Sequence, residues 1–219
     1  MTGRIAQAVV VVAVVAGVLV GAGLAGNQDV WKIARTPAGN RAAKSVMLRH
    51  ADFGAGWTGG ALKPDLKSTM PCSNYRPKQS DLTVVGAART SWRGPDLIVD
   101  DSANVLRTAH MVSLDWKRTV VAPQVLPCLR QGFKHAKNQK LISLHGVRFA
   151  HLTSMTRAYR VIVDYKGTGG TVRVESDLVA IGAGRTEMSL AVSGPASSAH
   201  QIRATERHAA RVIAARLKR

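Results

Sequence analysis

Alternation of apolar and polar residues along the chain is clearest in its last third. Three segments show it, at residues 158–165, 171–180 and 185–192. In the first, Val161 and Val163 alternate with Arg160 and Asp164. A period of two is typical of strands with one face on a core, and the glycine-rich stretches between the segments are typical of hairpin turns. The pattern predicts an antiparallel meander with one apolar face and one solvent-exposed, ion-paired face.

Shorter patterns predict further strands and helices. Strands are expected over 81–92, with Gly86 as a bulge, and over 102–107; helices are expected over 42–50, 109–121, 124–137 and 198–217. Pro64, Pro71 and Pro77 leave 58–81 as a loop. Together the elements predict the α+β class, an antiparallel sheet flanked by helices in the order β-β-α-β-β-β-α, with a second helix after the first.

The N-terminus carries a long apolar run, from Ile5 to Ala25, in which Gln7 is the one interruption. About 20 apolar residues suffice to cross a bilayer as a helix. We therefore expect one N-terminal transmembrane helix that acts as a signal-anchor (1–25), a juxtamembrane linker (26–41) and an exported domain (42–219). Cleavage near Ala25 and secretion is the alternative. Small residues recur at every fourth position of this helix, a spacing that allows a homodimer through Ala13, Gly17, Gly21 and Ala25.

Two sequence signals disagree on which side of the membrane the domain lies. Arg4 precedes the apolar run, whereas several basic residues follow it, and the positive-inside rule would then leave the domain in the cytoplasm. The chain has two cysteines, Cys72 and Cys128, without the spacing of a metal site. An isolated pair in an exported protein predicts a disulfide, with two buried thiols as the alternative. We give the cysteines more weight and expect export.

The formal charge of +18 favours polyanionic partners such as anionic lipid or wall polymer. The final helix concentrates that charge. Its apolar stripe is expected at Ile202, Ala209, Ile213 and Leu217, after a capping box formed by Ser198 and Gln201. The candidate anion-binding residues lie on the same helix and just beyond it: Arg203, Arg207, Arg211, Arg216, Lys218 and Arg219. We do not expect nucleic acid as a partner, because no aromatic residues interleave with this stripe.

Short segments of the chain resemble landmarks of small exported actinobacterial proteins. They are 51–58, 72–83, Asp115-Trp116 followed by Cys128-Leu129, 157–161 and 184–187. The resemblance covers roughly residues 42–218, and the layout is similar to the PsbP-like fold of mycobacterial lipoproteins and to extracellular sensor domains. It implies an exported, disulfide-bearing α+β module without known chemistry. The chain has no lipobox cysteine, so a peptide anchor would replace the lipid.

Motifs of known chemistry are absent from the sequence, or lie in the wrong context. Gly54 to Gly59 spells G-x-G-x-x-G, but no strand precedes it and no helix follows it, as a dinucleotide site requires. We predict no catalytic, metal or cofactor residues. The leading interpretation is a non-catalytic, sensor-like binding or accessory module outside the cytoplasm. The alternative is a surface protein that binds polyanions through its basic C-terminal helix, and a hydrolase is more remote.

Overall fold

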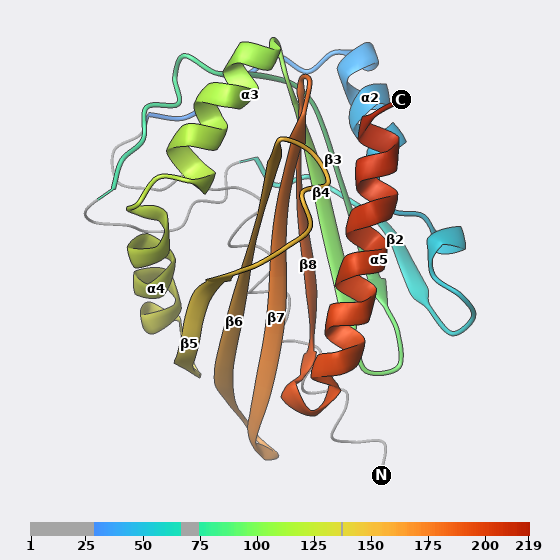
Figure 1. Ribbon diagram of the computed structural model, residues 1–219, viewed down its shortest axis with the longest axis vertical. Helices are drawn as coiled ribbons and strands as arrows, with labels where there is room; N and C mark the ends of the chain where they lie inside the picture. The colour runs from blue at the N-terminus through green and yellow to red at the C-terminus, as the bar shows by residue number, and fades with distance from the viewer. Residues whose placement is uncertain (1–28, 67–74, 137) are drawn as a thin grey trace.

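The computed structural model describes residues 29–66, 75–136 and 138–219, which form an eight-stranded sheet between two layers of helices (Figure 1). The strands are β1 (Lys32–Ile33), β2 (Thr58–Leu62), β3 (Thr83–Arg93), β4 (Ile98–Leu106), β5 (Gln139–Val147), β6 (Met155–Gly167), β7 (Gly170–Ala183) and β8 (Thr186–Pro195). The helices are α2 (Pro37–Val46), α3 (Ala109–Asp115), α4 (Val125–His135) and α5 (Ala199–Leu217). Short 3-10 turns occupy His50–Asp52 and Ala196–Ser198, and a π-helical turn occupies Trp116–Val120.

The sheet has the order β1-β3-β4-β8-β7-β6-β5, and β2 also pairs with β3. Strand β1 is parallel to β3, and the other pairs are antiparallel. The predicted mixed fold, a sheet flanked by helices, is confirmed. The five predicted strands correspond to β3, β4, β6, β7 and β8, and the ladder between β3 and β4 shifts register between Val84 and Gly86, as the bulge prediction required. Strands β1, β2 and β5 are additional.

Helices α2 and α5 cover one face of the sheet, and α3 and α4 cover the other (Figure 1). Ile202 and Ile213 of α5 pack in the same core cluster as Val179 of β7. The neighbouring Leu178 points the other way and packs with Leu129 of α4. Successive side chains of a strand alternate between faces, so β7 contributes to two cores at once. The predicted apolar stripe of α5 is confirmed, with Ile202, Ala209 and Ile213 fully buried.

One face of the meander is ion-paired, as predicted, but it faces solvent only at one end, where Arg173 pairs with Asp164 and its side chain is 55% exposed. The expectation of a solvent-exposed face is wrong for the middle of the meander. Arg160 of β6 and Asp177 of β7 are register partners on this face, and the Asp177 side chain is 0% exposed. Glu175, two residues earlier, is 5% exposed. Helix α5 packs over β7 and β8 and removes these carboxylates from water. The alternation of polar residues could not reveal this cover, because the helix lies elsewhere in the sequence.

Residues 32–41, expected to be a linker, belong to the fold. Lys32 and Ile33 pair with Thr83 and Val84 in the sheet. Helix α2 begins at Pro37, and the Thr36 side chain caps it by accepting a hydrogen bond from the Gly39 amide at 3.0 Å. Proline is well suited to the first turn of a helix because it has no amide hydrogen to leave unsatisfied. The folded part therefore includes residues before the predicted boundary at 42.

Two other local expectations are wrong. Residues 58–81, expected to be a loop, contain β2, which pairs with the C-terminal half of β3. Ser198 is the N-cap of α5 but makes no capping hydrogen bond, so the predicted capping box does not form. Its backbone, at φ −94° and ψ 18°, continues the preceding 3-10 turn, whereas a capping side chain needs an extended backbone.

None of the helices in the described part of the chain is long and apolar enough to cross a membrane. The predicted anchor over 5–25, its cleavage site and its stripe of small residues all lie outside the described residues. Cys72 also lies outside them, whereas Cys128 is buried on α4, at 3% exposure. The anchor, the dimer and the disulfide therefore stay predictions.

Candidate functional site

A buried ion-pair network lies between α5 and the sheet, and it begins on two neighbouring strands. The guanidinium group of Arg160 on β6 donates two hydrogen bonds to Asp177 of β7, from Nε to Oδ1 at 2.6 Å and from Nη2 to Oδ2 at 2.7 Å. The same Nε lies 3.2 Å from Oε1 of Glu175. Because the Asp177 carboxylate is buried, the bidentate pair offsets the cost of removing its charge from water.

Helix α5 joins the network through two residues of its first turns. Arg203 donates a hydrogen bond from Nη1 to Oε1 of Glu175 at 3.1 Å. Glu206, one turn later, is 3% exposed and hydrogen-bonds to Asp177. Burial raises the pKa of the Glu206 carboxyl to about 8, and the negative charge of Asp177 adds to the rise. Glu206 is therefore mostly protonated at neutral pH. A hydrogen bond between two carboxyl groups requires a proton on one of them, and Glu206 supplies it.

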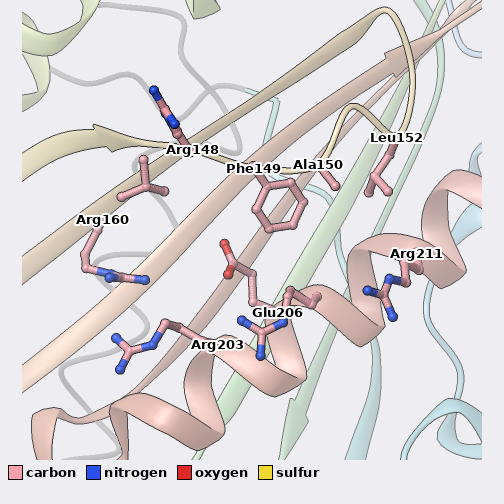
Figure 2. Close-up of a pocket in the computed structure, with 10 residues that line it drawn as sticks. Arg148, Phe149, Ala150, Leu152, Arg160, Arg203, Glu206 and Arg211 are labelled. Atoms are coloured by element: carbon pink, nitrogen blue, oxygen red, sulfur yellow. The ribbon is translucent and has the colours of Figure 1, made fainter.

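A cavity of about 280 Å³ opens above this network, and we call it the α5 pocket. Its walls come from α5, from Arg160 of β6, and from the end of β5 with the connection that follows it, residues 147–152. Figure 2 shows Phe149 and Leu152 on the connection facing α5, and the carboxyl group of Glu206 pointing from the helix toward the Phe149 ring. The lining residues are Val147, Arg148, Phe149, Ala150, Leu152, Arg160, Arg203, Glu206, Arg207 and Arg211.

The charge of the α5 pocket is strongly positive. Arg160 and Arg203 are held by the carboxylates of Asp177 and Glu175. Arg148, Arg207 and Arg211 line the same pocket and form no ion pair with the described residues. With Glu206 protonated, the guanidinium groups outnumber the carboxylates around the pocket. A concave surface with this excess attracts anions more strongly than a flat one, because its low-dielectric walls focus the field.

The structure divides the basic residues predicted on the C-terminal helix into two groups. Arg203, Arg207 and Arg211 line the α5 pocket together. Arg216 lies on another side of the helix, where Nη1 and Nη2 each approach the Asp52 carboxylate at 2.8 Å. Lys218 and Arg219 follow the last residue of α5. The six candidates therefore do not form one surface, and Arg216 has a structural partner.

Sequence reasoning missed the rest of the pocket. Arg160 lies on the strand face that the alternation predicts to be solvent-exposed, and no sequence pattern marks Glu206, Arg148 or Phe149 as part of a site. The one available signal was the spacing of Arg203 and Glu206 on the same helix, since residues three apart lie on neighbouring positions of its surface. Nothing local indicated that the β5–β6 connection would lie opposite them.

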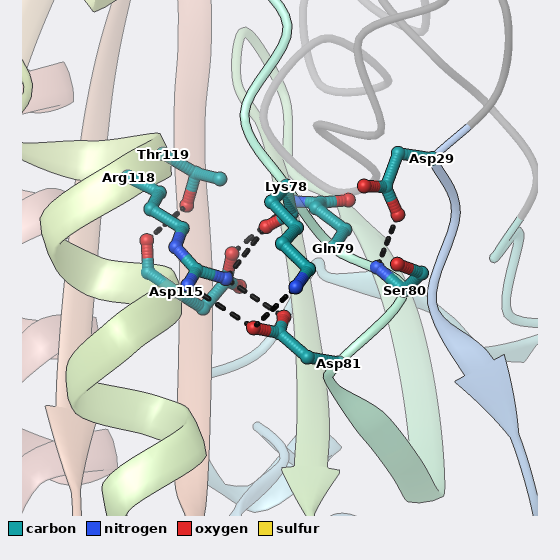
Figure 3. Close-up of polar contacts among 8 residues, drawn as sticks. All are labelled: Asp29, Lys78, Gln79, Ser80, Asp81, Asp115, Arg118 and Thr119. Atoms are coloured by element: carbon teal, nitrogen blue, oxygen red, sulfur yellow. Dashed lines mark hydrogen bonds and ion pairs between the residues drawn. The ribbon is translucent and has the colours of Figure 1, made fainter.

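A second polar cluster, on the other face of the sheet, has a structural role (Figure 3). Asp115, at 2% exposure, accepts a hydrogen bond from Nε2 of Gln79 at 3.2 Å and hydrogen-bonds to Glu187. Burial raises the pKa of both Asp115 and Glu187. Arg118 binds the Asp81 carboxylate through Nη1 at 2.8 Å and Nη2 at 3.2 Å. These contacts fasten the segment before β3 to α3 and the π-helical turn.

The described residues contain no group of three or more histidine, cysteine or acidic side chains arranged to hold a metal ion.

No protein-family model matches the sequence, and no curated protein sequence matches it either. Among solved structures, the extracellular domain of PknH from Mycobacterium tuberculosis is similar over 85% of this chain and 100% of that one, with 12% identity and a TM-score of 0.43. LpqN of Mycobacterium tuberculosis, involved in cell envelope biogenesis, is similar over 73% of this chain and 76% of its own, with 13% identity and a TM-score of 0.34. PA94, a putative regulator from Pseudomonas aeruginosa, gives 15% identity over 52% of this chain and 72% of its own, with a TM-score of 0.29. Likeness at this level assigns no function.

Proposed function

We propose that this chain is a non-catalytic binding module that acts outside the cytoplasm, and that its ligand carries negative charge and occupies the α5 pocket. The observation that carries the proposal is the set of three arginines, Arg148, Arg207 and Arg211, that line one cavity without an ion pair among the described residues. Guanidinium groups bind phosphate and carboxylate through paired hydrogen bonds, which makes them suited to such a ligand.

Isothermal titration of the full chain, purified in detergent, with inorganic pyrophosphate tests this proposal. We expect saturable binding that R207A/R211A weakens about tenfold or more, because each lost charge-assisted hydrogen bond removes binding energy. K218A/R219A is the matched control, since it removes the same formal charge beyond the end of α5. Equal losses in the two variants, or no binding by the unchanged protein, would refute an anion site in the pocket.

The second candidate function is the binding of an extended polyanion, such as anionic lipid or wall polymer, over the basic C-terminal surface. The formal charge of +18 and the exposed positions of Arg207, Arg211 and Lys218 favour it. Each basic residue near an anionic membrane contributes about 1 kcal/mol. Here K218A/R219A should weaken binding to phosphatidylglycerol vesicles as much as R207A/R211A does. Binding that is insensitive to salt would contradict this candidate.

The location outside the cytoplasm, with residues 5–25 as a single-pass anchor or a cleaved export signal, is part of the proposal. The predicted disulfide offers its test. A membrane-impermeant thiol reagent applied to intact cells should label both cysteines only after reduction. Labelling without reductant would argue against the disulfide, and none after reduction and denaturation would argue against export.

A further inference from the structure

We propose that the ligand of the α5 pocket is a hydroxylated organic anion: a compact sugar or polyol that carries a phosphate or carboxylate group. This inference rests on the proposed function and adds the chemistry of the ligand. Three features of the pocket carry it, namely its cationic wall, its apolar wall and one buried oxygen atom without a partner.

The cationic and apolar walls face each other across the cavity. Arg211 lies on α5 on one side, and Phe149 and Leu152 lie on the other (Figure 2). Arg207, also on α5, lines the same pocket. Phe149 and Leu152 are only partly buried by the core, so they leave apolar surface for a ligand. A bare inorganic anion would contact the cationic wall alone. A ligand with an apolar C–H face beside its charged group would use both, as the ring of a sugar does.

The buried oxygen atom is Oε1 of Glu206, which has no hydrogen-bond partner among the described residues. Glu206 hydrogen-bonds to Asp177, so one proton is shared between these two carboxyl groups. Since that proton lies between the two carboxyl groups, the other oxygen of Glu206, Oε1, can only accept a hydrogen bond. A buried acceptor without a donor costs free energy, and a ligand that supplies a donor recovers it. A hydroxyl group is such a donor, whereas a bare oxyanion is not.

The charges around Glu206 determine where the anionic group and the hydroxyl group of the ligand bind. Arg160 of β6 and Arg203 and Arg207 of its own helix attract the ligand's anionic group, while Asp177 and Glu175 of β7 repel it. Arg148, on the β5–β6 connection, adds a further positive charge to the lining. The anionic group therefore belongs at the outer arginines and the hydroxyl group at Glu206. The cavity of about 280 Å³ limits the ligand to a compact molecule.

Four probes separate these features in titrations of the full chain: glucose 6-phosphate, cyclohexyl phosphate, inorganic phosphate and glucose. We expect glucose 6-phosphate to bind about fivefold more tightly than cyclohexyl phosphate, which matches its ring and charge without the hydroxyl groups. Inorganic phosphate should bind more weakly than either, and glucose should not bind measurably. Glucuronate in place of glucose 6-phosphate tells a carboxylate ligand from a phosphate one.

Variants at Glu206 identify the group responsible. E206Q keeps an acceptor oxygen and can donate to Asp177 through its amide, so it should preserve the preference for glucose 6-phosphate over cyclohexyl phosphate. E206L should abolish the preference. Equal affinity of the unchanged protein for the two organic phosphates would overturn the inference, whatever the stability of E206L, while leaving the anion site intact. Failure of every phosphate probe to bind would instead refute the proposed function.

Discussion

At the scale of single residues, two glycines determine how closely α2 approaches the sheet. A Cβ atom added to Gly86 of β3 would lie 2.0 Å from the carbonyl oxygen of Gly39, and one added to Gly39 would lie 2.1 Å from the carbonyl oxygen of Val85. Both contacts are with backbone, which a side-chain rotation cannot relieve. Helix and strand are therefore in backbone contact at the bulge, and only glycine fits at either position.

We expect Gly86→Ala to lower the free energy of unfolding by about 2 kcal/mol or more, because the helix must move away from the strand. Gly54→Ala is the matched control: nothing lies within 4 Å of its added Cβ atom, and its φ is not in the left-handed region. The control should change stability by less than about 0.5 kcal/mol. Urea denaturation measures both variants, and similar losses would contradict the close approach.

At the scale of elements, α5 covers a polar part of the sheet and forms one wall of the α5 pocket. Its apolar stripe packs on β7 and β8, and this contact places Arg203 and Glu206 over Glu175 and Asp177. Its last turn is fixed separately by Arg216, which binds Asp52 and donates a hydrogen bond to the carbonyl oxygen of Met47 at 2.6 Å. The helix is thus held by a core in the middle and by ion pairs toward both ends.

Arg216→Ala should therefore destabilise the protein by about 2 kcal/mol, since Asp52 and the Met47 carbonyl lose charge-assisted hydrogen bonds at a half-buried position. Arg211→Ala, on the same helix, removes an exposed arginine that makes no ion pair with the described residues, so it should change stability by less than about 0.5 kcal/mol. Hydrogen exchange should also show faster exchange at the end of α5 in Arg216→Ala alone. Equal effects would mean that Arg216 contributes only its charge.

At the scale of the whole molecule, buried acids link stability to pH. Burial raises the pKa of Asp101 to about 7 and that of Glu206 to about 8. Burial also raises the pKa of Asp100, Asp115 and Glu187. The folded protein consequently binds more protons than the unfolded chain between the ordinary carboxyl pKa and these raised values, so stability must fall as pH rises through that range.

We expect the free energy of unfolding to fall by about 2 kcal/mol or more between about pH 5 and about pH 8. Asp101→Asn should flatten this dependence, because the variant cannot ionise there yet can still accept the hydrogen bond from the Leu48 amide. Denaturation curves at several pH values measure the slope. A stability that rises over this interval, or a slope that Asp101→Asn leaves unchanged, would show that these carboxyl groups do not titrate as the burial requires.

Much of the fold could be predicted because its signals are local. The alternation around Val161 and Val163 marks a strand whatever packs on it, and the spacing of Ile202, Ala209 and Ile213 marks a helix with one buried side. The sequence pattern does not predict β5 as an element, and it does not predict β2 because Gly59 and Gly60 are poor strand formers. The predicted site included Arg203, Arg207 and Arg211, but not what lies across from them.

The sequence by itself determined the types of most elements, the mixed class, and the positive charge of the last helix, because periodicity and composition depend only on neighbours along the chain. Only the tertiary structure decided that β4 pairs with β8, that α5 packs over β7 and β8 and buries the carboxylates of β7, and that the β5–β6 connection forms a wall of the α5 pocket. These contacts join segments far apart in sequence, and they depend on which apolar faces bury each other. The pattern of neighbouring residues along the chain does not predict which faces come together.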